Sequence, residues 1–280
     1  MQRVAIIGAG ELAGATAHIL ARRNVARSLL IIDAAGRIAE GKALDIAQAA
    51  PVEGFATELA GATDISMAAG ADAIVVADRA NGAEWQGEEG LILLKQLSAA
   101  APRSVIVCAG TLQRELVDRG VRELRLSRNR LFGSAPEALA GGARALVALA
   151  VNASPRDVAL TVLGVPPAHV VVPWEDVGVG GFAITRLLDE PTRRRVAARV
   201  NALWPPGPHA LAAAAAKALE VMAGRSFRLV SGFVAPDPSS AARTRTAAVP
   251  MRLGPSGLIE VVIPELSVVE RVALDNAMLL

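Results

Sequence analysis

The stretch VAIIGAGELAGATAHIL, residues 4–20, decides the fold of this chain. A short run of apolar residues leads directly into Gly8, Gly10 and Ala13, and a helical pattern follows at once. Gly8 permits a tight turn, Gly10 allows the backbone to approach a ligand, and the small Ala13 allows helix and strand to pack closely. The spacing therefore predicts a strand, a phosphate-binding turn and a helix in immediate succession.

The start of this helix and the end of the next strand complete the pattern. Unpaired N–H groups at Glu11 and Leu12, together with the partial positive charge of the helix end, favour a bound phosphate. Asp33 ends the next strand, where its carboxylate can accept from both hydroxyls of a ribose and repels a 2′-phosphate. These features predict NAD as the cofactor, bound by Gly8, Gly10, Glu11, Leu12 and Asp33.

Strand-like and helix-like segments alternate through the first half of the chain. Four apolar runs, RVAII, SLLIID, DAIVVA and SVIVCA, are separated by segments with helical spacing. This alternation predicts a doubly wound parallel α/β sheet of the Rossmann type. An Ala-rich helix over residues 137–151, strands around DVALTVLG and HVVVPW, and later helices and strand pairs predict a mixed α/β domain. We therefore expect a dinucleotide-binding domain at residues 1–133 and a second domain at residues 134–280.

The composition excludes several classes of function. Cys108 is the single cysteine, which rules out an internal disulfide and a multi-cysteine metal site, and we expect no metal. The absence of tyrosine excludes chemistry that needs a tyrosine general acid. The net charge of +2 comes from arginines interleaved with carboxylates, which indicates solvated helix faces and not a nucleic-acid surface. We find no membrane span and no signal peptide, and we expect a cytoplasmic protein.

Several segments, in order, resemble one known family. LLIIDAAGRIAEGKALDIAQAAPVEGF, residues 29–55, is similar to a typical segment of malate dehydrogenases, and NRLFG, SPRDV, TVLG, VGVGGFAIT and AVPMRLGPSGLIEVVIPEL follow in the same order. The chain thus resembles the lactate/malate dehydrogenase family almost to its C-terminus. The resemblance implies an NAD-binding Rossmann domain, a catalytic domain, and a homodimer or homotetramer in which the helix around residues 42–49 packs against a partner.

The same resemblance implies that the catalytic residues are replaced. The family moves hydride between a 2-hydroxy acid and NAD, using arginines that clamp carboxylates and a His–Asp pair that takes the hydroxyl proton. In this chain, the places of two loop arginines, a strand-end asparagine, the aspartate, a third arginine and the histidine fall in turn on Gly82, Glu88, Gly110, Leu139, Gly142 and Pro166. The resemblance therefore implies a member unable to perform the family's standard reaction.

A few residues are candidates for rebuilt chemistry. His169 follows a Pro-Pro pair and His209 begins a helix, where the family brings a loop toward its substrate, so each is a candidate base or a structural histidine. Arg79 is a candidate clamp for an acidic group, or an ordinary surface arginine. We expect His18 to be a packed helix residue and Cys108 to be a buried, inert thiol.

Two classes of function remain open. In the first, the chain is a catalytically degenerate dinucleotide-binding protein that acts as a sensor, scaffold or non-catalytic subunit. In the second, it is an active NAD-dependent oxidoreductase that acts on a different small hydroxy or oxo substrate. A purely structural role conflicts with the intact Gly8, Gly10 and Asp33.

Overall fold

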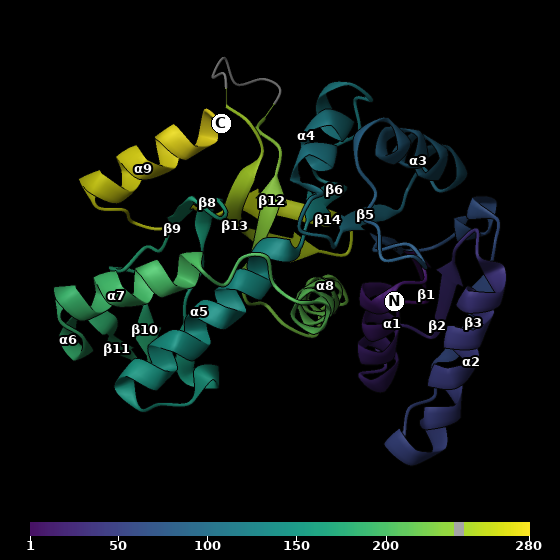
Figure 1. The fold of residues 1–280 in the computed structure, drawn as a ribbon, viewed down its shortest axis with the longest axis horizontal. Helices are drawn as coiled ribbons and strands as arrows, with labels where there is room; N and C mark the ends of the chain where they lie inside the picture. The colour runs from purple at the N-terminus through teal and green to yellow at the C-terminus, as the bar shows by residue number, and fades with distance from the viewer. Residues whose placement is uncertain (238–243) are drawn as a thin grey trace.

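The structure is a computed structural model that describes residues 1–237 and 244–280 (Figure 1). Its N-terminal half is a parallel sheet in the order β3-β2-β1-β4-β5-β6. The elements of this half are β1 (Arg3–Ile7), α1 (Glu11–Arg22), β2 (Ser28–Ile32), α2 (Gly36–Glu53), β3 (Glu58–Ala62), the 3-10 helix η1 (Ile65–Ala68), β4 (Ala73–Val76), α3 (Gly87–Ala100), β5 (Val105–Cys108), α4 (Arg114–Arg122) and β6 (Leu131–Gly133). This arrangement confirms the predicted Rossmann-type sheet.

Helices cover both faces of this sheet because its strands are apolar on both sides. Successive residues of a strand point to opposite faces, and residues 4–7 of β1 are fully or almost fully buried on each. Val4 and Ile6 belong to one apolar cluster with α1 and α2, whereas Ala5 and Ile7 belong to a second cluster with α3 and α4. The continuous apolar runs of the sequence thus mark buried parallel strands.

The C-terminal half extends the same sheet with antiparallel strands and adds a small second sheet. The main sheet continues from β6 through β12, β13, β8 and β9, with β14 beside β13, and β11-β10-β7 form the second sheet. The elements are α5 (Ala135–Val151), the 3-10 helix η2 (Pro155–Asp157), β7 (Val158–Ala159), β8 (Leu163–Val165), β9 (His169–Val171), β10 (Gly178–Val179), β11 (Phe182–Ala183), α6 (Ile184–Leu187), α7 (Glu190–Asn201), α8 (Pro208–Met222), β12 (Val230–Val234), β13 (Ala247–Gly254), β14 (Gly257–Val261) and α9 (Val268–Met278).

The segment DVALTVLG differs from the single strand expected there. It forms β7 and β8, which belong to different sheets. Between them the backbone bonds to side chains: the carbonyl of Leu160 accepts from Arg144, and the N–H of Val162 donates to Ser231 Oγ. These side-chain partners satisfy backbone groups that would otherwise need a strand neighbour.

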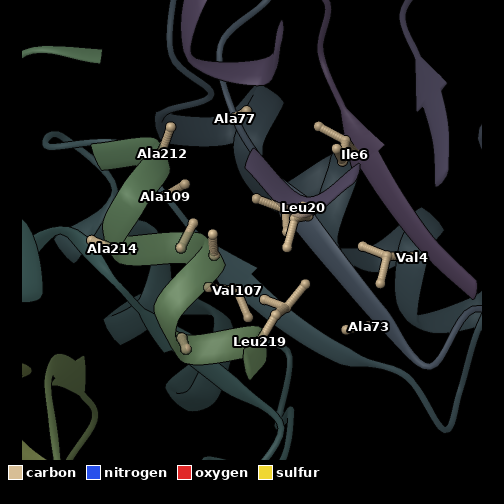
Figure 2. Packing of buried hydrophobic residues seen from close by; sticks show 14 of the residues in the cluster. Val4, Ile6, Leu20, Ala73, Ala77, Val107, Ala109, Ala212, Ala214 and Leu219 are labelled. Carbon is tan, nitrogen blue, oxygen red and sulfur yellow. The ribbon is translucent and has the colours of Figure 1, made fainter. Parts of the chain in front are cut away.

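Helix α8 joins the two halves of the molecule. It packs against both α1 and α5 and lies between them in Figure 1. Figure 2 shows its Ala212 and Leu219 in the same cluster as Ile6 and Val107 of the parallel sheet. Its alanines allow close approach, so the beginning of α8 is held beside the beginning of α1. Among the described residues, no helix is both long and apolar enough to cross a membrane.

Candidate functional site

The chain turns sharply between β1 and α1. Gly8 has a φ of +114°, and a Cβ atom at Gly8 would overlap the carbonyl oxygen of Asp78. The N–H of Gly8 donates to the carbonyl of Ile32 at 2.7 Å, and the N–H of Gly10 donates to the carbonyl of Asp78 at 3.0 Å. The turn therefore lies between the carboxyl ends of β2 and β4, where the strand order reverses and open α/β sheets bind their ligands.

The Asp33 side chain, predicted to hold a ribose, is hydrogen-bonded within the protein. Its Oδ2 accepts from the N–H groups of Ala9 at 2.9 Å and Ala80 at 3.0 Å, and its Oδ1 accepts from that of Ala35 at 2.8 Å. The residue is still partly exposed. Because an ionised carboxylate has about four acceptor positions, Asp33 retains capacity for a further hydroxyl donor.

A second carboxylate, which the sequence did not indicate, lies on the N-terminus of α1. Asp78 follows β4; its Oδ2 accepts from the N–H of Leu12 at 3.1 Å and its Oδ1 from that of Ala13 at 2.9 Å. Asp78 is only 7% exposed, and a Cβ atom at Gly10 would overlap its carboxylate. Asp78 therefore caps the helix from another part of the chain, in place of the side chain that Gly10 lacks.

The segment from Asp78 to Glu84, called here the 78–84 hairpin, folds back on itself. Its two end residues form an antiparallel bridge. The N–H of Arg79 donates to the carbonyl of Ala83 at 2.9 Å, and the N–H of Gly82 donates to the carbonyl of Arg79 at 2.8 Å. The family resemblance places a mobile loop here, and in this chain backbone hydrogen bonds close it.

Glu84 anchors the far end of the hairpin. Its Oε1 accepts from the N–H and hydroxyl of Thr111, both at 3.0 Å, and its Oε2 accepts from the N–H of Leu112 at 2.8 Å. A Cβ atom at Gly110 would overlap this carboxylate, so glycine makes room for it.

Burial, with a smaller contribution from Glu84, raises the pKa of the Cys108 thiol to about 12, in keeping with an inert thiol.

Arg79 is engaged in contacts within the protein. Its guanidinium pairs with Glu89 and lies 3.9 Å from the centroid of the Trp85 ring. These three side chains, Asp33 and residues of α3 line a cavity of about 330 Å³. The candidate clamp is therefore part of a cavity wall, with its charge already paired.

The three histidines have different environments. The Nε2 atom of His18 is 3.1 Å from Glu53, and His169 is exposed on β9. His209, 84% exposed at the start of α8, lies 4.0 Å from Glu11. Across the described residues, no side-chain hydrogen bond joins His169 to His209 or to an acid.

Leu139 and Gly142, where the resemblance places the family's aspartate and one of its arginines, are packed against apolar side chains of the C-terminal half. Leu139 is fully buried in an apolar cluster of the C-terminal half, and a Cβ atom at Gly142 would lie 2.6 Å from Cδ1 of Leu203. Leu139 and Gly142 lie in α5, which also carries an ion pair: Glu137 and Arg144 are 2.7 Å apart. Oε2 of Glu137 also accepts from the N–H of Ser231 at 2.9 Å, so this buried acid ties α5 to β12.

A larger cavity, of about 660 Å³, lies between α5, α8 and the segment around β7. Its charged lining residues are Arg23, Glu137, Arg144, Arg156, Asp157, Asp176, Lys217 and Arg228. Burial, with a contribution from Glu265, raises the pKa of Asp176. The lining thus carries both signs of charge.

Within the part of the chain that the structure describes, no group of three or more His, Cys, Asp or Glu side chains is placed to hold a metal ion.

Comparison with known proteins finds similarity both in the N-terminal residues and over the whole chain. Residues 2–96 match the family described as lactate/malate dehydrogenase, NAD binding domain. Over its length the chain is similar to malate dehydrogenase of Thermomicrobium roseum, with 28% identity over 293 residues that cover 99% of this chain and 94% of the relative. Malate dehydrogenase of Thioalkalivibrio sulfidiphilus is 28% identical over 210 residues, which cover 72% of this chain and 68% of that relative.

Solved structures share the whole fold. A malate dehydrogenase from Salinibacter ruber matches with a TM-score of 0.86 at 23% identity, covering 99% of this chain and 94% of that one. A lactate dehydrogenase from Cryptosporidium parvum, solved with lactic acid and nicotinamide adenine dinucleotide, matches with a TM-score of 0.86 at 20% identity, with the same coverage. The match of residues 2–96 to an NAD-binding domain confirms NAD as the cofactor predicted for this part of the chain. Over its length the chain is similar to malate dehydrogenases and shares their fold.

Proposed function

We propose that this NAD-binding chain is a member of the lactate/malate dehydrogenase family that does not oxidise malate or lactate. The observation that carries the proposal is the pair of positions that correspond to the family's base and its orienting acid, Pro166 and Leu139. Proline offers neither a proton nor a lone pair at its side chain, and Leu139 is fully buried among apolar residues. General base catalysis of the family's kind therefore has no base at these positions.

The substrate clamps support the same conclusion. Glu88, at the position of one loop arginine, is an acid whose carboxylate pairs with Arg119 at 2.6 Å. Gly82, at the position of the other loop arginine, has no side chain. Arg79 is held by Glu89 and Trp85. A dicarboxylate would thus meet an anion where the family supplies a cation.

The residues that would hold NAD suit it in type. The cofactor supplies the acceptor for hydride when it is bound. In this chain the Gly8–Gly10 turn would bring backbone close to the ligand, and Asp33 would take the ribose. The N–H groups of Glu11 and Leu12 would serve its phosphates once Leu12 is released from Asp78. The cavity beside Asp33, which α3 helps to line, would be available to the adenosine end of the cofactor. We assign NAD binding to residues 1–133 and any substrate to residues 134–280.

A second candidate function, an oxidoreductase acting on another small hydroxy or oxo substrate, is favoured by one observation. His209 and Glu11 come together at 4.0 Å beside the phosphate-binding turn. A histidine oriented by a carboxylate is the usual form of a general base. Both side chains are largely exposed, at 84% and 71%, which argues for the first candidate.

The chain is also proposed to assemble as a homodimer or homotetramer through α2. The exposed apolar side chains Ile38, Leu44 and Val52 on this helix support an interface there. The cytoplasmic location stays a prediction from the sequence.

Turnover with a panel of 2-oxo acids tests the proposal. With NADH and oxaloacetate, pyruvate or other 2-oxo acids, we expect rates below about 10⁻³ s⁻¹. Enzymes typically turn over at about 10 s⁻¹, and loss of a general base alone costs about 10²- to 10⁴-fold. The measurement is NADH absorbance at high protein concentration. A rate near 1 s⁻¹ that His209→Ala or His169→Ala abolishes, and that His18→Ala leaves unchanged, would establish the second candidate instead.

A further inference from the structure

We propose that Asp78 is an intramolecular competitor of NAD for the N-terminus of α1, so that NAD binds only when the 78–84 hairpin releases this carboxylate. The inference deepens the proposed function and rests on NAD being the ligand. It does not depend on whether any hydride transfer follows.

The competition arises because one set of donors serves two anions. A phosphate at a helix N-terminus binds to the unpaired N–H groups of the first turn. In this chain the N–H groups of Leu12 and Ala13 already donate to Asp78, at 3.1 and 2.9 Å. The carboxylate also fills the space beside Gly10 that lets a pyrophosphate approach the backbone. Two anions in contact repel strongly at a site this buried, so they exclude each other.

The carboxylate is held in place by the rest of the hairpin. The bridge between Asp78 and Glu84 and the Arg79–Ala83 bond fix its backbone, and Glu84 is bonded in turn to Thr111 and Leu112. Displacement of Asp78 therefore strains or opens the 78–84 hairpin, which is also bonded to the residues that follow β5. Occupancy by NAD and opening of the hairpin become one coupled equilibrium.

The size of the effect follows from what Asp78 contributes to the closed state. A side chain that caps a helix, combined with a negative charge at the positive end of the helix dipole, favours the closed state by about tenfold to a hundredfold. The apparent affinity for NAD equals the affinity of the open form multiplied by the fraction of molecules that are open. Removing the carboxylate is therefore expected to tighten NADH binding by about the same factor.

The experiment compares NADH titrations of the wild type, Asp78→Asn and Asp78→Ala, with binding followed by energy transfer from tryptophan and by calorimetry. Asp72→Asn is the matched control, because Asp72 also accepts from two successive N–H groups, those of Gln2 and Arg3, at the opposite end of β4. We expect a tenfold or larger gain in affinity for both Asp78 variants, and none for Asp72→Asn. Circular dichroism and thermal unfolding show whether each variant is folded.

Hydrogen exchange on the wild type provides a measurement that needs no variant. Saturating NADH is expected to speed exchange at the N–H groups of Arg79 and Gly82, which close the hairpin. Equal affinity of the wild type and folded Asp78 variants, or unchanged exchange in the NADH complex, would overturn the inference and leave NAD binding intact. No NADH binding by any folded variant would overturn both the inference and the NAD-binding part of the proposed function.

Discussion

Replacing Gly8 with alanine is expected to lower the free energy of unfolding by about 3 kcal/mol or more. Gly8 has a φ of +114°, which L-residues rarely adopt, and a Cβ atom would overlap the carbonyl oxygen of Asp78. Strained backbone costs about 1–3 kcal/mol, and overpacking about 1–3 kcal/mol more. The clash is with backbone that is fixed by the pairing of β1 with β4, so a side-chain movement cannot relieve it.

Gly141→Ala is the matched control for this prediction. Gly141 lies inside α5, and a Cβ atom there would meet nothing within 4 Å. Alanine at such a helical position is expected to stabilise the protein by about 1 kcal/mol. The measurement is the midpoint and slope of urea unfolding for both variants. A loss smaller than about 1 kcal/mol for Gly8→Ala would contradict the geometry described for this turn.

Replacing Glu137 with alanine is expected to cost about 3–5 kcal/mol of unfolding free energy, the usual loss when one partner of a buried ion pair is removed. Glu137 is 6% exposed and binds Arg144 at 2.7 Å and the N–H of Ser231 at 2.9 Å. Alanine leaves both donors without this partner. Arg144 keeps its bonds to the carbonyl of Leu160, and Ser231 loses the acceptor for its N–H.

Glu260→Ala is the control for Glu137→Ala. Its ion pair with Arg252 has the shorter distance, 2.6 Å, yet the side chains are 54% and 48% exposed. Exposed pairs contribute about 0–1 kcal/mol. Urea unfolding of both variants measures the difference. Equal losses for the two would mean that Glu137 does not hold α5 to β12 as described.

The sequence predicted the parts of the fold that local pattern determines. The buried strands, the turn at Gly8 and Gly10, and the position of Asp33 after a strand all follow from residues close together in the chain. Cys108 was predicted as a buried thiol because it ends an apolar strand, and it is fully buried. The split of DVALTVLG into two strands was not predicted, because it depends on bonds from Arg144 and Ser231 in distant elements.

The two carboxylates of the hairpin could not be predicted in the same way. Asp78 and Leu12 are 66 residues apart, and Glu84 and Leu112 are 28 apart. The local sequence offers one weak signal for each. For Asp78 it is an acid directly after the strand DAIVVA, and for Glu84 it is Gly110, after SVIVCA, which makes room for its carboxylate. Because the carboxyl ends of parallel strands share one edge of the sheet, an acid after one strand can reach the turn after another. That rule indicates the neighbourhood of Asp78, and only the folded backbone determines its partners.

A single-turnover experiment tests most directly the claim that this chain binds NAD without the family's chemistry. Protein in excess over NADH is mixed with saturating oxaloacetate, with energy transfer from tryptophan reporting binding and absorbance reporting oxidation. The account predicts that NADH is bound and is oxidised no faster than about 10⁻³ s⁻¹, so that most of it is still reduced after several minutes. The reason is that no base or carboxylate clamp stands at the positions of Pro166, Leu139, Gly82 and Glu88. Oxidation of the bound NADH within seconds would contradict it.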